Sequence, residues 1–180
     1  MSDFAVLSQK HNRITLNSSG LEGTGIDLAA WGSSANQITS GGWPSANLAI
    51  YVPVAVYQPF IALKMLIQNG TTINGNVDAG IYDDQGDRLV SIGSTAHAGS
   101  SSIQSFDITD TTLEPGIYYL ACAFDGNTAT INHDIAGILV GGSAGVLQQA
   151  SALPLPATAT FAAIASAYVP NIVVTGRTLI

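Results

Sequence analysis

The segment Gly141-Gly-Ser-Ala-Gly145 has the G-x-S-x-G spacing of a nucleophile elbow, in which a serine sits on the sharp turn after a strand. That serine needs an acid and a histidine later in the chain, because the histidine takes the hydroxyl proton and the acid orients the ring. No Asp, Glu or His follows Ser143. We therefore interpret the segment as a glycine-rich loop and expect no catalytic residue in this chain.

Two groups of acidic residues could offer oxygen ligands to calcium, which favours several carboxylates on a tight loop. One is Asp83-Asp-Gln-Gly-Asp87, and the other is the pair Asp107 and Asp110. Neither has the spacing of an EF-hand loop. Asp and Gly are also the residues that a hairpin turn selects for backbone reasons, so we interpret both groups as turn residues.

The histidines and the cysteine give no further sign of a metal or cofactor site. His11, His97 and His133 lie far apart in the sequence, so a zinc site would need folding to bring them together. Cys122 is the only cysteine and lies in an apolar run, which predicts a small buried side chain and excludes an intrachain disulfide. We expect no metal and no cofactor.

Aromatic residues are the remaining candidates for binding, because rings stacked on sugar faces are a common means of recognising carbohydrate. Tyr51 and Tyr57 are predicted by strand alternation to point away from the apolar side of their strand. An outward tyrosine in an assembly is equally suited to a protein interface. The candidate glycan or interface contacts are Trp43, Tyr51, Tyr57, Tyr82 and Tyr118.

The composition narrows the class of protein. Of the 180 residues, 47 % are hydrophobic and only 9 % are charged, with a net charge of −7 and a mean hydropathy of +0.33. A typical soluble domain has about 25 % charged residues, so this surface is easier to understand if neighbouring proteins cover part of it. The five basic residues are too scattered to neutralise a run of phosphates, which argues against direct nucleic-acid binding.

Neither a secretory signal nor a membrane span is expected. Residues 1–10 contain no basic stretch leading into a long apolar core. The longest apolar stretch, Leu48 to Leu63, is interrupted by prolines and is shorter than the roughly 18 to 20 residues that a spanning helix needs.

Most of the chain after residue 42 shows strand patterns. Even-numbered residues from Leu48 to Val56 are apolar and would share one face, and Pro53 predicts that this strand lies at an edge or carries a bulge. The next run would place Ile61, Leu63, Met65 and Ile67 on one face.

Turns separate the strands that follow. The Asn-Gly pairs at 69–70 and 74–75 predict a hairpin into the strand whose inward face carries Val77, Ala79 and Ile81. Residues 117–124 should form the most central strand. About eight short strands with regular turns predict an all-β, antiparallel β-sandwich that is jelly-roll-like.

The first 42 residues are interrupted by Gly and Ser every few residues, which predicts an extended arm that precedes a sandwich domain of residues 43–180. Trp31 and Trp43 are its expected anchors. Because ordering such a glycine-rich segment costs roughly 1 to 2 kcal/mol per residue in backbone entropy, we expect the arm to dock on another subunit.

Four runs of the sandwich domain resemble the small jelly-roll modules of tailed-bacteriophage virion proteins: residues 46–54, 75–83, 107–110 and 113–120. Such modules occur in head fibres, capsid decoration proteins and tail adhesins. The resemblance implies a non-enzymatic virion structural protein, made in the host cytoplasm and assembled with other capsid or tail proteins. It brings no catalytic or binding residue with it, and a carbohydrate-binding tail adhesin is the alternative.

The stretch from Ile135 to Gly176 contains no Asp, Glu, Lys, Arg or His. A sandwich strand usually shows some charge on the face that meets water, so both faces of this part are expected to be covered. Another copy of the chain is the simplest cover, and the small residues between Leu153 and Tyr168 would allow close approach. We therefore expect a cyclic homo-oligomer such as a trimer.

Overall fold

The computed structural model describes residues 25–29, 38–134, 145–166 and 168–178, and these residues are all-β. Every paired strand is antiparallel, so the predicted antiparallel β-sandwich is confirmed. The strands are β1 (Gly25–Ala29), β2 (Ile38–Gly42), β3 (Ala49–Val56), β4 (Phe60–Gln68), β5 (Asn76–Asp83), β6 (Arg88–Ser91), β7 (Thr95–Ala96), β8 (Ile103–Leu113), β9 (Gly116–Phe124), β10 (Thr130–Asp134), β11 (Leu147–Gln149), β12 (Ala162–Ala163), β13 (Val169–Pro170) and β14 (Ile172–Thr178).

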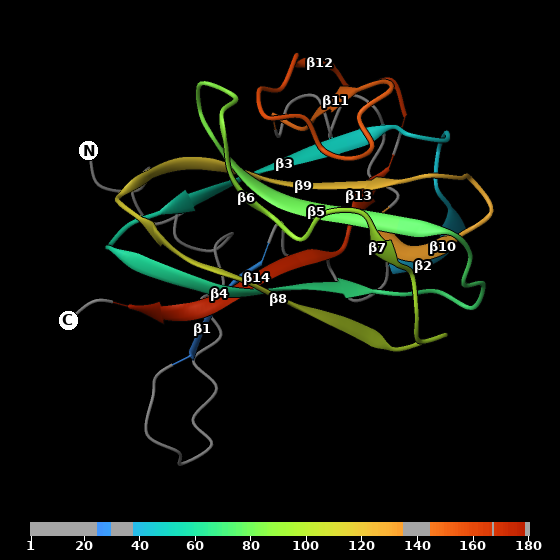
Figure 1. Ribbon diagram of the computed structural model, residues 1–180, viewed down its shortest axis with the longest axis horizontal. Helices are drawn as coiled ribbons and strands as arrows, with labels where there is room; N and C mark the ends of the chain where they lie inside the picture. The colour runs from blue at the N-terminus through green and yellow to red at the C-terminus, as the bar shows by residue number, and fades with distance from the viewer. Residues whose placement is uncertain (1–24, 30–37, 135–144, 167, 179–180) are drawn as a thin grey trace, which may run out of the picture.

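Two sheets face each other and a small third sheet lies at one end (Figure 1). One has the order β12-β11-β3-β9-β5-β6, with β7 also paired to β5, and is called the β9 sheet below. The opposing β4 sheet has the order β1-β14-β4-β8, and the small sheet has the order β13-β10-β2. Because β9 pairs with both β3 and β5, its predicted central position is confirmed.

The chain crosses repeatedly between the two large sheets. Strand β3 belongs to the β9 sheet, β4 to the opposing sheet and β5 again to the β9 sheet. The hairpin predicted at residues 69–75 is therefore wrong, because the strands on either side of it lie in different layers. A local Asn-Gly signal favours a tight turn but does not determine whether the next strand returns to the same sheet. The hairpin predicted at residues 83–87 is present between β5 and β6.

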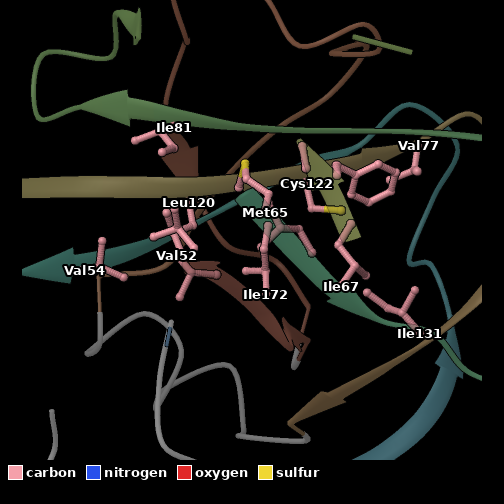
Figure 2. Packing of buried hydrophobic residues seen from close by; sticks show 14 of the residues in the cluster. Val52, Val54, Met65, Ile67, Val77, Ile81, Leu120, Cys122, Ile131 and Ile172 are labelled. Carbon is pink, nitrogen blue, oxygen red and sulfur yellow. The ribbon is translucent and has the colours of Figure 1, made fainter. Parts of the chain in front are cut away.

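The core lies between the two large sheets, and strand alternation places its residues there. The even-numbered residues of β3 share this face as predicted, and Val77, Ala79 and Ile81 of β5 meet them from the same sheet. Figure 2 shows Val52, Leu120 and Cys122 pointing toward Met65 and Ile172 of the β4 sheet. Cys122 is completely buried, which raises the pKa of its thiol and agrees with the prediction of a packing residue.

The single alternating face predicted for residues 61–67 is wrong. The pairing of β4 with β8 shifts between Ala62 and Lys64, which marks a bulge. An extra residue at a bulge reverses the side on which the following residues point. Phe60 and Ala62 before the bulge and Met65 and Ile67 after it therefore face the core, whereas Ile61 and Leu63 are only partly buried.

Among the described residues, the part of β3 beyond Tyr51 is an edge on the side away from β9, as predicted for Pro53. Strand β11 pairs with β3 only at residues 49–51, whereas β9 pairs with it along its whole length. Pro53 lies beyond the last residue paired to β11, so its missing N–H breaks no bond on that side.

Two described parts of the predicted arm belong to the sandwich of their own chain. Gly25–Ala29 pairs with β14, and Ile38–Gly42 pairs with β10. The expectation that the arm docks on another subunit is therefore wrong for these residues, because pairing with their own sheets supplies the backbone hydrogen bonds. Residues 1–24 and 30–37, which include Trp31, lie outside the described residues.

Candidate functional site: the outer face of the β9 sheet

The β9 sheet buries most of its outer face, the one turned away from the β4 sheet. Residues 145–166, called the covering segment below, run across it with β11 and β12 (Figure 1). A second apolar cluster forms between sheet and segment, apart from the main core. Its buried members are Ala49, Tyr51, Tyr82, Ala121, Ala123, Ala152 and Leu155.

The covering segment changes the interpretation of the uncharged carboxy-terminal stretch. The β9 sheet covers one side of its described residues 145–166, but residues such as Ser151, Thr158 and Thr160 are exposed although the segment carries no charge. The fold therefore accounts for cover on one side only, and cover of the other side by a partner chain stays a prediction. Within the segment Ile164 is buried in the main core, whereas Ala162 and Ala163 are exposed.

A buried carboxylate fastens the centre of the covering segment. The Asp78 side chain is completely buried, and its Oδ2 accepts a hydrogen bond from the backbone N–H of Leu155 at 2.9 Å. Arg88 donates to the carbonyl oxygen of the same Leu155. Burial raises the pKa of Asp78, and the nearby hydrogen bonds and the Arg88 charge only partly oppose this effect.

The β5–β6 hairpin extends this attachment along the segment. The Tyr82 hydroxyl donates to the carbonyl of Pro156 at 2.6 Å, and the N–H of Arg88 donates to the carbonyl of Ala157 at 2.8 Å. Thr158 then donates its hydroxyl to the Asp87 carboxylate at 3.0 Å. The hairpin and the segment therefore form one hydrogen-bonded unit.

The acidic cluster at 83–87 has the backbone role that the sequence indicated. Asp83 Oδ1 accepts hydrogen bonds from the N–H groups of Gln85 and Asp87, at 3.0 and 2.8 Å. Asp107 forms an exposed ion pair with Lys64 at 2.8 Å. Within the described residues, no three His, Cys, Asp or Glu side chains are grouped to hold a metal ion.

Three of the five aromatic candidates lie inside the protein. Trp43 is 2 % exposed, and Tyr51 and Tyr82 have no exposed surface. Tyr51 does point away from the main core, as alternation predicted, but the covering segment lies over it, and its ring meets those of Tyr82 and Phe161 edge-on at 5.2 and 5.1 Å. Burial raises the pKa of Tyr51 to about 12. These three rings are not available to stack on a sugar in this fold.

The other two aromatic candidates lie at the surface. Tyr57 is 67 % exposed just beyond the end of β3. Tyr118 is partly buried against the core, and its hydroxyl donates to the carbonyl of Glu114 at 3.0 Å.

The covering segment leaves one end of the outer face open. Along β9, Leu120 and Cys122 face the core, so Ile117 and Tyr119 are on the outer face, and Ile117 is 50 % exposed. Ile117 is paired with Ala55, and Tyr119 with Pro53. Ala55, Ile117 and Tyr57, which follows β3 directly, form the open patch. Pro53 and Tyr119 are its border toward the covering segment, because the Tyr119 ring contacts that of Phe161 with centroids 4.9 Å apart.

Ile117 was not predicted to lie at the surface, because it begins an apolar run that is typical of a buried strand. The alternation that places Leu120 and Cys122 inward would also have placed it outward.

Of Ser143 and the three histidines considered above, the structure describes only His97 and His133. Ser143 and His11 lie outside the described residues. His133 stacks on Tyr168 with ring centroids 3.7 Å apart, whereas His97 meets the edge of Phe124 at 5.0 Å. Both imidazoles are buried against aromatic rings, which is a packing role.

No protein-family model and no curated protein matches this chain. The described residues contain no helix that could cross a membrane.

Buried His97 makes stability depend on pH. Burial lowers its pKa from the ordinary value of 6.5, so the unfolded chain binds a proton there at a higher pH than the folded chain does. The stability linked to neutral His97 is present above the ordinary pKa and is lost as the pH falls toward the lowered value. As the pH is lowered from about 8 to about 5, we expect the free energy of unfolding measured in urea to fall less for His97→Phe than for the unchanged protein. Equal losses in both proteins would contradict this assignment.

Proposed function

We propose that this chain is a non-enzymatic structural protein of a tailed-bacteriophage virion, assembled as a capsid decoration or head-fibre-type subunit after synthesis in the host cytoplasm. The observation that carries the proposal is the open patch, with half-exposed Ile117 and largely exposed Tyr57, on a chain with only 9 % charged residues. A protein surface of this kind favours association with other proteins over a free monomeric life. The resemblance of residues 46–54, 75–83, 107–110 and 113–120 to phage jelly-roll modules supports a virion as the assembly.

Mass spectrometry of purified particles tests the proposal. The phage or prophage that encodes the chain is induced, and its particles are separated from free protein on a density gradient. We expect peptides of this chain in the particle fraction at many copies per particle. Particles that contain all major head and tail proteins but lack this chain would contradict the proposal. Only a few copies of this chain per particle would indicate a position at the tail tip instead of the capsid surface.

A carbohydrate-binding tail adhesin is the second candidate, and the exposure of Tyr57 favours it. A glycan array probed with the full chain would compare the unchanged protein with Tyr57→Ala. Tyr51→Ala does not serve as a test, because a buried ring affects binding through folding. Binding that Tyr57→Ala removes while the unfolding midpoint is unchanged would support the adhesin.

We also propose that the subunits form a homo-oligomer such as a trimer, through the exposed small residues of β12. Ala163→Asp adds a charge at an exposed position and is the suitable variant. Ile164→Asp is unsuitable because Ile164 is a core residue. We expect light scattering to show an oligomer that Ala163→Asp dissociates, and a monomer at micromolar concentration would contradict this proposal.

A further inference from the structure

The connection between β4 and β5 contains two Asn-Gly pairs, at residues 69–70 and 74–75. An Asn side-chain amide that precedes Gly is open to attack by the backbone nitrogen of that Gly, because Gly has no Cβ to crowd the approach and adopts many backbone angles. The attack ends in the conversion of Asn to an acid. Both pairs share this local chemistry, so the surrounding fold decides how fast each one reacts.

The fold protects the first pair. Asn69 is 1 % exposed, and its Nδ2 donates hydrogen bonds to the carbonyl oxygens of Ala98 and Gly99 at 2.6 and 3.0 Å. The N–H of Gly70 donates to the carbonyl oxygen of Thr130 at 2.8 Å. The amide nitrogen that would leave and the backbone nitrogen that would attack are therefore both held in hydrogen bonds, away from solvent.

The second pair lacks these restraints. Asn74 and Gly75 are both exposed. Within the described part of the chain, neither the side-chain amide of Asn74 nor the N–H of Gly75 has a hydrogen-bond partner. The nitrogen that would attack and the amide that would be attacked therefore meet at a solvent-exposed turn.

The glycine of this second pair is required by the fold. Gly75 has a φ of 66°, and a Cβ at this position would overlap Oδ1 of Asp125. Its carbonyl oxygen accepts a hydrogen bond from the N–H of His97 at 3.0 Å, and Asp125 Oδ2 accepts from the N–H of Asn76 at 2.8 Å. The entry to β5 thus fixes the residue type that permits the attack while it leaves the attacking nitrogen unbonded.

We propose that Asn74 is a site of spontaneous deamidation through a cyclic imide and that the fold keeps Asn69 intact. The nitrogen of Gly75 forms a bond to Cγ of Asn74, and the bond between Cγ and Nδ2 breaks. Nδ2 leaves as ammonia with the proton that the Gly75 nitrogen loses. Water then opens the imide at either of its carbonyl carbons, which gives aspartate or isoaspartate at position 74.

The product differs from the original chain in charge and in backbone length. It adds one negative charge to a chain of net charge −7, at a turn that already holds the Asp125 carboxylate. In the isoaspartate form the backbone runs through Cγ and is longer by one methylene just before β5. This proposal does not depend on a virion role, so it can fail or succeed independently of the proposed function.

Peptide mass spectrometry of the folded full chain tests the proposal. The chain is incubated at mildly alkaline pH, which favours loss of the proton from the attacking nitrogen, and samples are digested at intervals from time zero. Enzymatic methylation of isoaspartate then separates the two products. We expect position 74 to convert at least about tenfold faster than position 69. In guanidinium chloride the two positions should convert at rates within about twofold of each other, because the fold no longer distinguishes them.

Two variants at exposed positions identify the reacting residue. Asn74→Gln has a longer side chain that would need a larger ring, so we expect no conversion at position 74 and an unchanged unfolding midpoint. The matched control is Asn76→Gln, since Asn76 is also exposed but precedes Val77. Asn76→Gln should leave the rate at position 74 unchanged.

Three outcomes would overturn the proposal. Equal rates at positions 69 and 74 in the folded chain would show that the fold does not select between the pairs. Conversion of both positions in guanidinium chloride, with none at position 74 in the folded chain, would show that this turn is protected as well. Aspartate at position 74 without isoaspartate would indicate direct hydrolysis of the side chain instead of attack by Gly75.

Discussion

Replacing Asp78 with alanine is expected to release the covering segment and to lower the free energy of unfolding by about 3 kcal/mol. The substitution removes the acceptor of the Leu155 N–H at a site without solvent, and it leaves the charge of Arg88 without its nearby carboxylate. Urea unfolding measures the loss. Limited proteolysis followed by mass spectrometry should locate new cleavage sites within residues 145–166, because those residues then spend time away from the sheet.

Asp78→Asn is the matched control. Its amide oxygen can still accept from Leu155, and the neutral side chain does not carry the desolvation penalty of the carboxylate, so we expect a change below about 1 kcal/mol. The free energy of unfolding is also expected to depend on pH through Asp78. Because burial raises the folded-state pKa of Asp78, its neutral form is favoured in the fold, and its penalty is largest above that pKa. The unchanged protein should therefore gain stability relative to Asp78→Asn as the pH falls.

The inference that Asp78 holds the covering segment on the sheet would be contradicted if Asp78→Ala unfolded at the same urea concentration as the unchanged protein and kept residues 145–166 resistant to protease. An equal loss in Asp78→Ala and Asp78→Asn would show that the charge, and not the hydrogen-bond acceptor, holds the segment.

Strand alternation made much of the sandwich predictable. Side chains in a strand point alternately to opposite faces, so the apolar residues at even positions of 48–56 had to share a side, and they line the core. The same rule placed Val77, Ala79 and Ile81. It failed at residues 61–67, because a bulge adds one residue to the count without a clear signal in the sequence.

Pairing between distant segments was harder to predict than the strands themselves. The chain leaves β4 and enters β5 in the opposite layer, and this choice depends on packing of the whole domain. The turn residues Asn69 and Gly70 suit a hairpin locally. In the structure Asn69 is buried and its side chain donates to the carbonyls of Ala98 and Gly99, which holds a long connection in place.

The candidate site shows the same division between local and distant information. Strand alternation correctly predicted that Tyr51 points away from the main core. It does not indicate whether solvent, a partner or another part of the chain lies over the outer face of the sheet. The covering segment lies about a hundred residues further along the chain than β3. One contact between them is the hydrogen bond that the Tyr51 hydroxyl donates to Oε1 of Gln149, 98 residues away in the sequence. The uncharged stretch was predicted to be covered by another chain, and its sequence contained no sign that residues 145–166 themselves lie over the β9 sheet.

Trp43→Ala is expected to lower the free energy of unfolding by about 3 to 5 kcal/mol, the range found when a large buried aromatic side chain is removed from a core. Its ring is 2 % exposed and packs against Phe124 and Tyr168, with centroids 4.9 and 5.4 Å away. Its indole N–H also donates to the carbonyl of Leu48 at 2.8 Å, so the substitution leaves a buried acceptor without its donor. Urea unfolding monitored by circular dichroism measures the effect.

Tyr57→Ala is the control for this prediction, since Tyr57 is 67 % exposed and its removal should change stability by less than about 0.5 kcal/mol. The two variants also separate folding from recognition. If a glycan or a protein binds through the open patch, Tyr57→Ala should weaken binding without a change in stability. Trp43→Ala should weaken binding only in proportion to the unfolded fraction, so that adding a stabilising salt restores it. Equal stability of the two variants would contradict the placement of Trp43 in the core.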